Sequence, residues 1–317
     1  MMKKCFLVLA VVACCACSKG VTSSFDEKGE IVELNFSVPV AATKVSGVVS
    51  ESDVESLQVF VFGADGQVQS SGIANENSLT LTCSTGDKQI AAIVNSPEIE
   101  GVNKLDDLNT LMSSFSNNEV GNFVMSGNEN KTLLSSGPVE ITVSRLVSKV
   151  SLISVTRDFK LQQHKNMDFE LISAFMTNVP EMLGYFNAQQ SDELINDGET
   201  EIDEIISASG RLLYDNLNIP IAQGASVDVG NYLYCYPNVL DDTSKPAYLV
   251  VQTRLGDGIY YYSVELPKME SNKCYNVSLT VTMPGSLTPN VPVQKEDAVF
   301  SVSVSDWSGN INVNETI

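Results

Sequence analysis

The segment IVELNFSVPV, Ile31–Val40, carries the clearest strand pattern near the start of the chain. Apolar side chains alternate along it with polar residues or proline, at Val32, Leu34, Phe36, Val38 and Val40. A period of two is typical of a β-strand with one buried face. The following residues, AATKVSG, are small apart from Lys44, and exposed loops of small residues are preferred sites of proteolysis. A well-formed strand therefore precedes a segment that suits a protease.

The same strand signal recurs along most of the chain. Two Asp-Gly pairs, Asp65-Gly66 and Asp257-Gly258, lie between apolar runs and predict tight hairpins, since glycine accepts the positive φ of such turns. Further alternating runs cover residues 79–83, 139–143, 275–281 and 300–304. Only residues 105–115, with apolar side chains at helical spacing, predict a short amphipathic helix. The pattern predicts an all-β fold of two β-sandwich domains with a few short helices.

The domain organisation follows from a change of strand phase. The alternation of Val139, Ile141 and Val143 shifts through Arg145 and resumes at Val150. We therefore expect an N-terminal sandwich at 31–146 and a C-terminal sandwich at 147–317, preceded by a tether at 18–30.

The first residues, MMKKCFLVLAVVACCACSKG, have the features of a secretory signal. Two lysines precede an apolar run that is too short to span a membrane, and small residues with cysteine follow. This order resembles the lipobox of bacterial outer-membrane lipoproteins. It predicts a signal peptide at 1–17 and an acyl chain, such as palmitate, on Cys17, with Cys14 as the alternative.

Composition argues against several functions. The chain has 39 acidic and 19 basic side chains, a formal charge of −20, whereas nucleic-acid binding needs a basic face. His164 is the single histidine, so zinc sites built on histidine pairs are excluded, and no phosphate-binding loop or nucleophile elbow occurs. We expect no enzyme, cofactor or metal. Beyond the signal, Cys83, Cys235 and Cys274 predict buried free thiols, or at most one disulfide.

Five segments in order resemble the fimbrillins that build type V pili of Gram-negative anaerobes. They are LQVFVFGADGQV (57–68), KQIAAIVN (88–95), FVMSG (123–127), VEITVSRLVSKVSL (139–152) and CYNVSLTVTMPGSLTPNVPVQKEDAVFSVSVSDW (274–307). The resemblance implies two transthyretin-like β-sandwich domains. It also implies an outer-membrane lipoprotein precursor that polymerises into a cell-surface fimbrium and supports adhesion.

In that family the first strand occupies a groove until a surface Arg- or Lys-directed protease cuts after it. The resemblance therefore implies that residues 31–44 are removed. The C-terminal strand of another subunit, with Phe300, Val302, Val304 and Trp307, would then take their place. This chain has no arginine before Arg145, so the cut is expected between Lys44 and Val45.

Three alternatives stay open. A permanently lipidated anchor subunit would retain residues 31–44. A surface lipoprotein would bind glycans through the tyrosines at 232, 234, 236 and 260–262. The strand at 31–40 could also be a permanent edge strand. Expected partners are other copies or related subunits, the protease, the outer membrane through a lipid, and host proteins or glycans.

Overall fold

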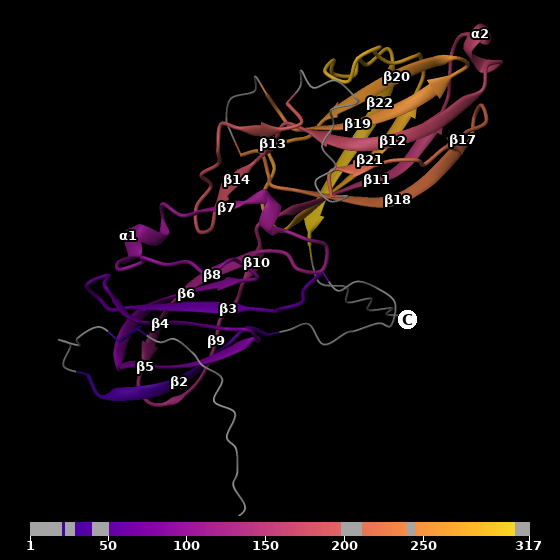
Figure 1. The fold of residues 1–317 in the computed structure, drawn as a ribbon. Coiled ribbons are helices and arrows are strands. Elements are labelled where there is room, and N and C mark those ends of the chain that lie inside the picture. Colours follow the sequence, from indigo (N-terminus) through magenta and orange to yellow (C-terminus); the bar gives the residue numbers. More distant parts are fainter. Residues whose placement is uncertain (1–20, 23–28, 40–50, 198–210, 240–244, 308–317) are drawn as a thin grey trace, which may run out of the picture.

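The computed structural model describes residues 21–22, 29–39, 51–197, 211–239 and 245–307. Strands are the main secondary structure of the described chain and helices are few and short, so the predicted all-β sandwich fold with a few short helices is confirmed. Figure 1 shows two lobes, which we call the N-terminal lobe and the C-terminal lobe. The large sheets of the first lobe end at Arg145, and those of the second begin at Ser148.

The N-terminal lobe is a sandwich of two sheets. The larger sheet has the order β1-β4-β3-β6-β8-β10. Its strands are β1 (Val21–Thr22), β3 (Leu57–Phe62), β4 (Val68–Ala74), β6 (Gly86–Val94), β8 (Met125–Leu133) and β10 (Ser144–Arg145). The smaller sheet consists of β2 (Ile31–Ser37), β5 (Ser78–Ser84) and β9 (Gly137–Glu140), in the order β5-β2-β9. The predicted first strand is thus the middle strand of its sheet.

The C-terminal lobe is a second sandwich. One sheet has the order β18-β11-β21-β22, with β11 (Ser148–Arg157), β18 (Ser226–Cys235), β21 (Lys273–Val281) and β22 (Ala298–Asp306). The other has the order β16-β12-β19-β20, with β17 also beside β12. Its strands are β12 (Phe169–Thr177), β16 (Leu213–Tyr214), β17 (Ile219–Pro220), β19 (Tyr248–Leu255) and β20 (Gly258–Glu265). The terminal strand β22 therefore lies at a sheet edge.

Two small ladders complete the β-structure. β13 (Val179–Pro180) pairs with β15 (Leu194–Ile195), and β7 (Met112–Ser114) pairs with β14 (Met182–Gly184). The second ladder joins segments from the two halves of the sequence. Among the described residues, no helix is long and apolar enough to cross a membrane.

Both predicted Asp-Gly hairpins are present. In the β3–β4 turn Gly66 has φ +76°, and the Asp65 carboxylate accepts a hydrogen bond from the Gln67 amide. In the β19–β20 turn the positive φ, +58°, belongs to Gly256, because Leu255 already pairs with Gly258. The turn signal predicts the second hairpin correctly, although an earlier glycine makes the turn.

The predicted helix over residues 105–115 is mostly wrong. Only α1 (Leu105–Leu108) is α-helical, and β7 and a 3₁₀ turn, η1 (Phe115–Asn117), follow it. The backbone from Met112 on pairs with β14 instead of continuing the helix. A second helix, α2 (Gln162–Lys165), is equally short. Tertiary pairing overrides the local apolar spacing here.

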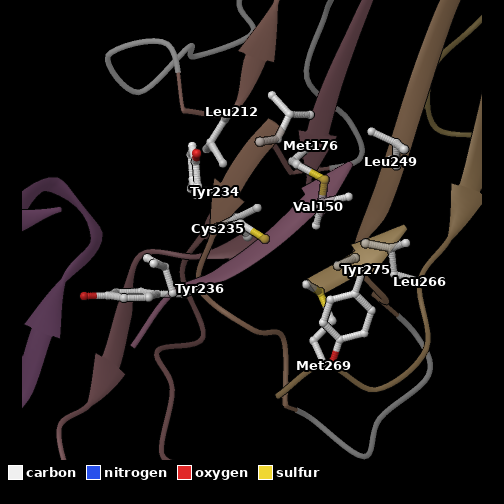
Figure 2. Packing of buried hydrophobic residues seen from close by; sticks show 14 of the residues in the cluster. Val150, Met176, Leu212, Tyr234, Cys235, Tyr236, Leu249, Leu266, Met269 and Tyr275 are labelled. Carbon is white, nitrogen blue, oxygen red and sulfur yellow. The ribbon is translucent and has the colours of Figure 1, made fainter. Parts of the chain in front are cut away.

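The larger sheet of the N-terminal lobe is buried on both faces, and one of these faces packs toward the C-terminal lobe. Every residue of β3 is buried. Val59 and Val61 face the sandwich core of the N-terminal lobe, whereas Phe60 and Phe62 belong to the apolar cluster that continues into the C-terminal lobe. Figure 2 shows part of this cluster where it lies between the sheets of the C-terminal lobe. This second cluster, the shared core, thus spans both lobes and is separate from the sandwich core inside the N-terminal lobe.

Candidate functional site

Strand β2 is paired on both sides. All seven of its residues pair with antiparallel β5, from Ile31 opposite Ser84 to Ser37 opposite Ser78. Its second half also pairs with parallel β9, from Leu34 opposite Gly137 onward. An edge strand would have one neighbour only, so β2 is not an edge strand. Loss of β2 would leave β5 and β9 with unpaired backbone groups facing one another.

The apolar face of β2 fills the core of the N-terminal lobe. Val32, Leu34, Phe36 and the adjacent Val38 are all buried, and Phe36 is 0% exposed. Their partners in this core include Leu79, Leu81 and Val139 from the two neighbouring strands. At roughly 1.5–3 kcal/mol for each buried side chain, the four contribute at most about 6–12 kcal/mol. An empty groove is therefore strongly unfavourable and would favour a replacement strand.

A buried thiol lies on the strand next to β2. Cys83 stands opposite Val32 in the β2–β5 ladder and is fully buried. Burial raises the pKa of the Cys83 thiol above its ordinary value. The residue would become exposed if β2 left, so Cys83 is a natural probe of the groove. All three described cysteines are free, including buried Cys235 and half-buried Cys274.

The terminal strand β22 has a different character. It pairs on one side only, with antiparallel β21. Phe300, Val302 and Val304 share the inward-pointing side of the ladder, opposite buried residues of β21. They are nevertheless poorly covered, since Phe300 is 39% and Val304 51% exposed. Trp307 is not part of this exposed row. It lies just beyond the strand and is 4% exposed.

The two strands lie in different lobes. Figure 1 shows β2 at the outer end of the N-terminal lobe, and β22, in yellow, running toward the junction of the lobes. If β22 acts as a donor strand, it would therefore have to enter the groove of another molecule and not the groove of its own subunit.

Several predicted site residues lie outside the described residues: Val40, Lys44, Val45 and the cysteines 14 and 17.

The tyrosines do not form a common platform. Of the six, Tyr234, Tyr236, Tyr261 and Tyr262 are buried, whereas Tyr232 is exposed. Tyr234 and Tyr236 pack in the shared core, and Figure 2 shows them following one another along β18 and the residue after it. This distribution does not favour glycan binding through these side chains.

Sequence reasoning missed one group of residues. Glu51 and Trp307 meet at the lobe junction beside Arg145 and Lys149. In the sequence, Arg145 marked the shift of strand phase and Trp307 ended the expected donor strand. Lys149 only lay within a segment that resembles the fimbrillins, and Glu51 was not singled out. A contact between residues so far apart in the chain leaves no periodic signal.

Comparison with known proteins gives a consistent result. Residues 32–157 match the family model of the major fimbrial subunit protein (FimA). The fimbrillin resemblance is confirmed. No curated protein sequence matches the chain.

Solved structures share the fimbrillin fold over most of the chain. A fimbrilin (FimA) from Porphyromonas gingivalis W83 superposes with a TM-score of 0.64 at 14% identity, covering 87% of this chain and 97% of that one. A Bacteroides eggerthii protein whose suggested role is cell adhesion gives 0.66 at 18% identity, covering 90% and 98%. The C-terminally truncated tip fimbrial protein Mfa3 from P. gingivalis gives 0.52 at 14% identity, covering 88% and 100%. At these identities the similarity establishes the fold.

Proposed function

We propose that this chain is a fimbrial structural subunit that polymerises at the cell surface by donor-strand exchange. The observation that carries the proposal is the placement of β2. A strand with ladders on both sides and a fully buried apolar face closes a groove that another strand of the same period can fill. The match of residues 32–157 to the major fimbrial subunit family supports the same function.

The terminal strand β22 supplies the replacement. Its alternating Phe300, Val302 and Val304 have the spacing of the buried residues of β2, and in the monomer they are incompletely covered. Transfer into the groove would bury them and add a second hydrogen-bonded neighbour. Because donor and groove lie in different lobes, donation is head-to-tail and builds an open filament rather than a closed dimer.

Proteolysis triggers the exchange. An Arg- or Lys-directed surface protease cuts between Lys44 and Val45, which releases β2 together with its lipid on Cys17 or Cys14. The uncut lipoprotein waits at the outer membrane, and the cut form assembles into fimbriae that support adhesion to host proteins or glycans. The chain has no other basic residue between β2 and β3, which supports Lys44 as the cut position.

The N-terminal sequence of the subunit in pili sheared from cells tests this trigger. We expect chains that begin at Val45. A Lys44→Ala variant should remain uncut and membrane-bound, whereas Lys44→Arg should be cut and polymerise. If the sheared pili contain only acylated chains that retain residues 31–44, the trigger is wrong and the chain acts as an anchor subunit.

Disulfide trapping tests the exchange itself. In a Cys274→Ser background, cysteine is introduced singly at Phe300, Val302 or Val304, and the donor should bring one of them against native Cys83 of the next subunit. Crosslinked ladders on a non-reducing gel are the expected result. Ser301→Cys and Ser303→Cys are matched controls, because these positions point to the opposite side of β22. Equal crosslinking from both faces, or none from the inward face, would contradict donation by β22.

A further inference from the structure

The residue just beyond β22 is much better buried than most of the strand itself. Trp307 is 4% exposed, although the strand before it is mostly exposed. Its backbone amide donates to the carbonyl oxygen of Asn272 at 3.1 Å. Its indole Nε1 donates to Glu51 Oε2 at 2.9 Å. The end of the strand is thus fixed to a residue of the other lobe.

The indole ring lies among side chains from both lobes. Tyr234 of β18 stacks on it with 5.7 Å between ring centroids, and Phe123 meets it edge-on at 5.6 Å. The Arg145 guanidinium lies 4.4 Å from the ring centroid. Aromatic and cation–π contacts of this kind each stabilise a buried ring.

The carboxylate of Glu51 organises this junction. Oε1 accepts hydrogen bonds from Lys149 Nζ at 2.8 Å and from the Tyr234 hydroxyl at 2.6 Å, while Oε2 accepts the Trp307 indole. Burial alone would raise the pKa of Glu51, but the bonds from Lys149, Tyr234 and Trp307 outweigh it and lower the pKa below its usual range. The acceptor is therefore an ionised carboxylate.

The backbone that carries Glu51 is also fixed. Arg145 Nε donates to the Glu51 carbonyl oxygen at 2.7 Å. Asn95, which has a left-handed φ of 56°, accepts a bond from the Glu55 amide at 2.8 Å and donates to the Asp53 carbonyl oxygen at 2.8 Å. Glu51 follows Lys44 closely in the sequence. The proposed cut and the Trp307 contact thus lie on one stretch of chain.

We propose that the contact between Glu51 and Trp307 is an autoinhibitory latch that retains β22 on its own subunit. The inference rests on the proposed function of β22 as the donor strand. An edge strand with an exposed apolar row can leave its sheet only after its anchored end is released. The monomer then has two separate controls on assembly, the groove occupied by β2 and the donor held by Trp307.

Amide hydrogen exchange of the uncut chain tests the latch. Trp307→Phe removes the indole N–H and keeps an aromatic ring, and Glu51→Ala removes the acceptor. We expect β22 amides to exchange about 10- to 100-fold faster in both variants, the factor that corresponds to one hydrogen bond to a charged group. Amides of β20 in the facing sheet should be unaffected.

A matched control is Tyr236→Phe. This variant also removes hydrogen bonds at the lobe junction without touching β22. The Tyr236 hydroxyl donates to the Ser114 carbonyl oxygen and accepts from the Asn118 side-chain amide. The Tyr236→Phe variant should leave β22 exchange unchanged. Equal acceleration in β20 and β22 in the Trp307→Phe variant would indicate general destabilisation and overturn the latch, as would no acceleration at all.

Polymerisation separates the latch from the function on which it rests. Uncut Trp307→Phe should stay monomeric, because β2 still fills the groove, whereas its cut form should assemble about tenfold faster than the cut wild type. If β22 amides exchange faster in the variants but no cut form polymerises, β22 is not a donor strand. The conclusion that Trp307 retains β22 in the wild-type monomer would then still hold. If cut wild type polymerises and β22 exchange in the variants is unchanged, the latch alone is wrong.

Discussion

Phenylalanines in β2 and β22 should have opposite effects on the monomer and on the polymer. Phe36 is 0% exposed, and truncation of such a core residue costs about 3–5 kcal/mol, so Phe36→Ala should lower the free energy of unfolding of the uncut N-terminal lobe by about 4 kcal/mol. Phe300 is 39% exposed at an open edge. Partial loss of its transfer free energy, without an enclosed cavity, should cost only about 1–2 kcal/mol in Phe300→Ala.

The ranking reverses after cleavage. The proposed cut removes residue 36, so Phe36→Ala polymers should match wild-type polymers in length and in resistance to denaturant. Phe300 would then be enclosed in the groove, so Phe300→Ala should weaken the polymer by about 3–5 kcal/mol for each junction. The matched control in β2 is Ile31→Ala, because the Ile31 side chain is 54% exposed. This variant should change the stability of neither the uncut monomer nor the polymer by more than about 1 kcal/mol.

Urea unfolding of the uncut chain, followed by sedimentation and electron microscopy of the cut chain, measures both effects. Polymers weakened by Phe36→Ala would mean that β2 persists in the filament, and the exchange mechanism would be refuted. Normal polymers from Phe300→Ala would refute β22 as the donor.

Three further outcomes follow from the described geometry. Cys83 should resist maleimide in the uncut chain and should react rapidly once β2 has left, in a variant that cannot donate β22. Thiol labelling followed by mass spectrometry would detect this change. No gain of reactivity would argue that the groove stays closed. Because the pKa of Glu51 is lowered in the folded state, its contribution is present above the ordinary pKa and is lost as the pH falls through the folded value. Emission of Trp307, the single tryptophan, should therefore shift to longer wavelength on acidification, and Glu51→Gln should flatten that dependence. Gly127→Ala should destabilise the chain by about 3 kcal/mol in thermal unfolding, because a Cβ there would stand 1.9 Å from the Thr142 carbonyl oxygen. A loss of stability smaller than that of Ile31→Ala would contradict this close approach.

The sequence predicted the features of β2 that are local. The alternation around Phe36 specified a strand and its buried face, because the side-chain period of a strand is visible in any short window. The middle position of β2 was not predictable, since its second neighbour is a parallel strand much later in the chain. The amide of Glu33 donates to Ser136 Oγ across a separation of 103 residues.

The latch was beyond sequence reasoning for a related physical cause. The bond from Trp307 to Glu51 spans 256 residues and depends on how two lobes pack. In the sequence, Glu51 is followed by Asp53 and Glu55, and such a run of acidic residues has the appearance of solvated surface charge. The role of Glu51 depends on the simultaneous presence of Lys149, Tyr234 and Trp307, none of which is near it in the chain.

The two-sided pairing of β2 also has a consequence for the order in which the chain folds. The hairpin β3–β4 pairs residues close in sequence, so it can form early. In contrast, β2 obtains its second neighbour only when β9 has been synthesised and has reached it. We expect insertion of β2 to be among the last steps of folding of the N-terminal lobe. Immediately before that step, the lobe already has its groove open. A filament that grows by strand replacement would then repeat, between molecules, the final folding step of each one.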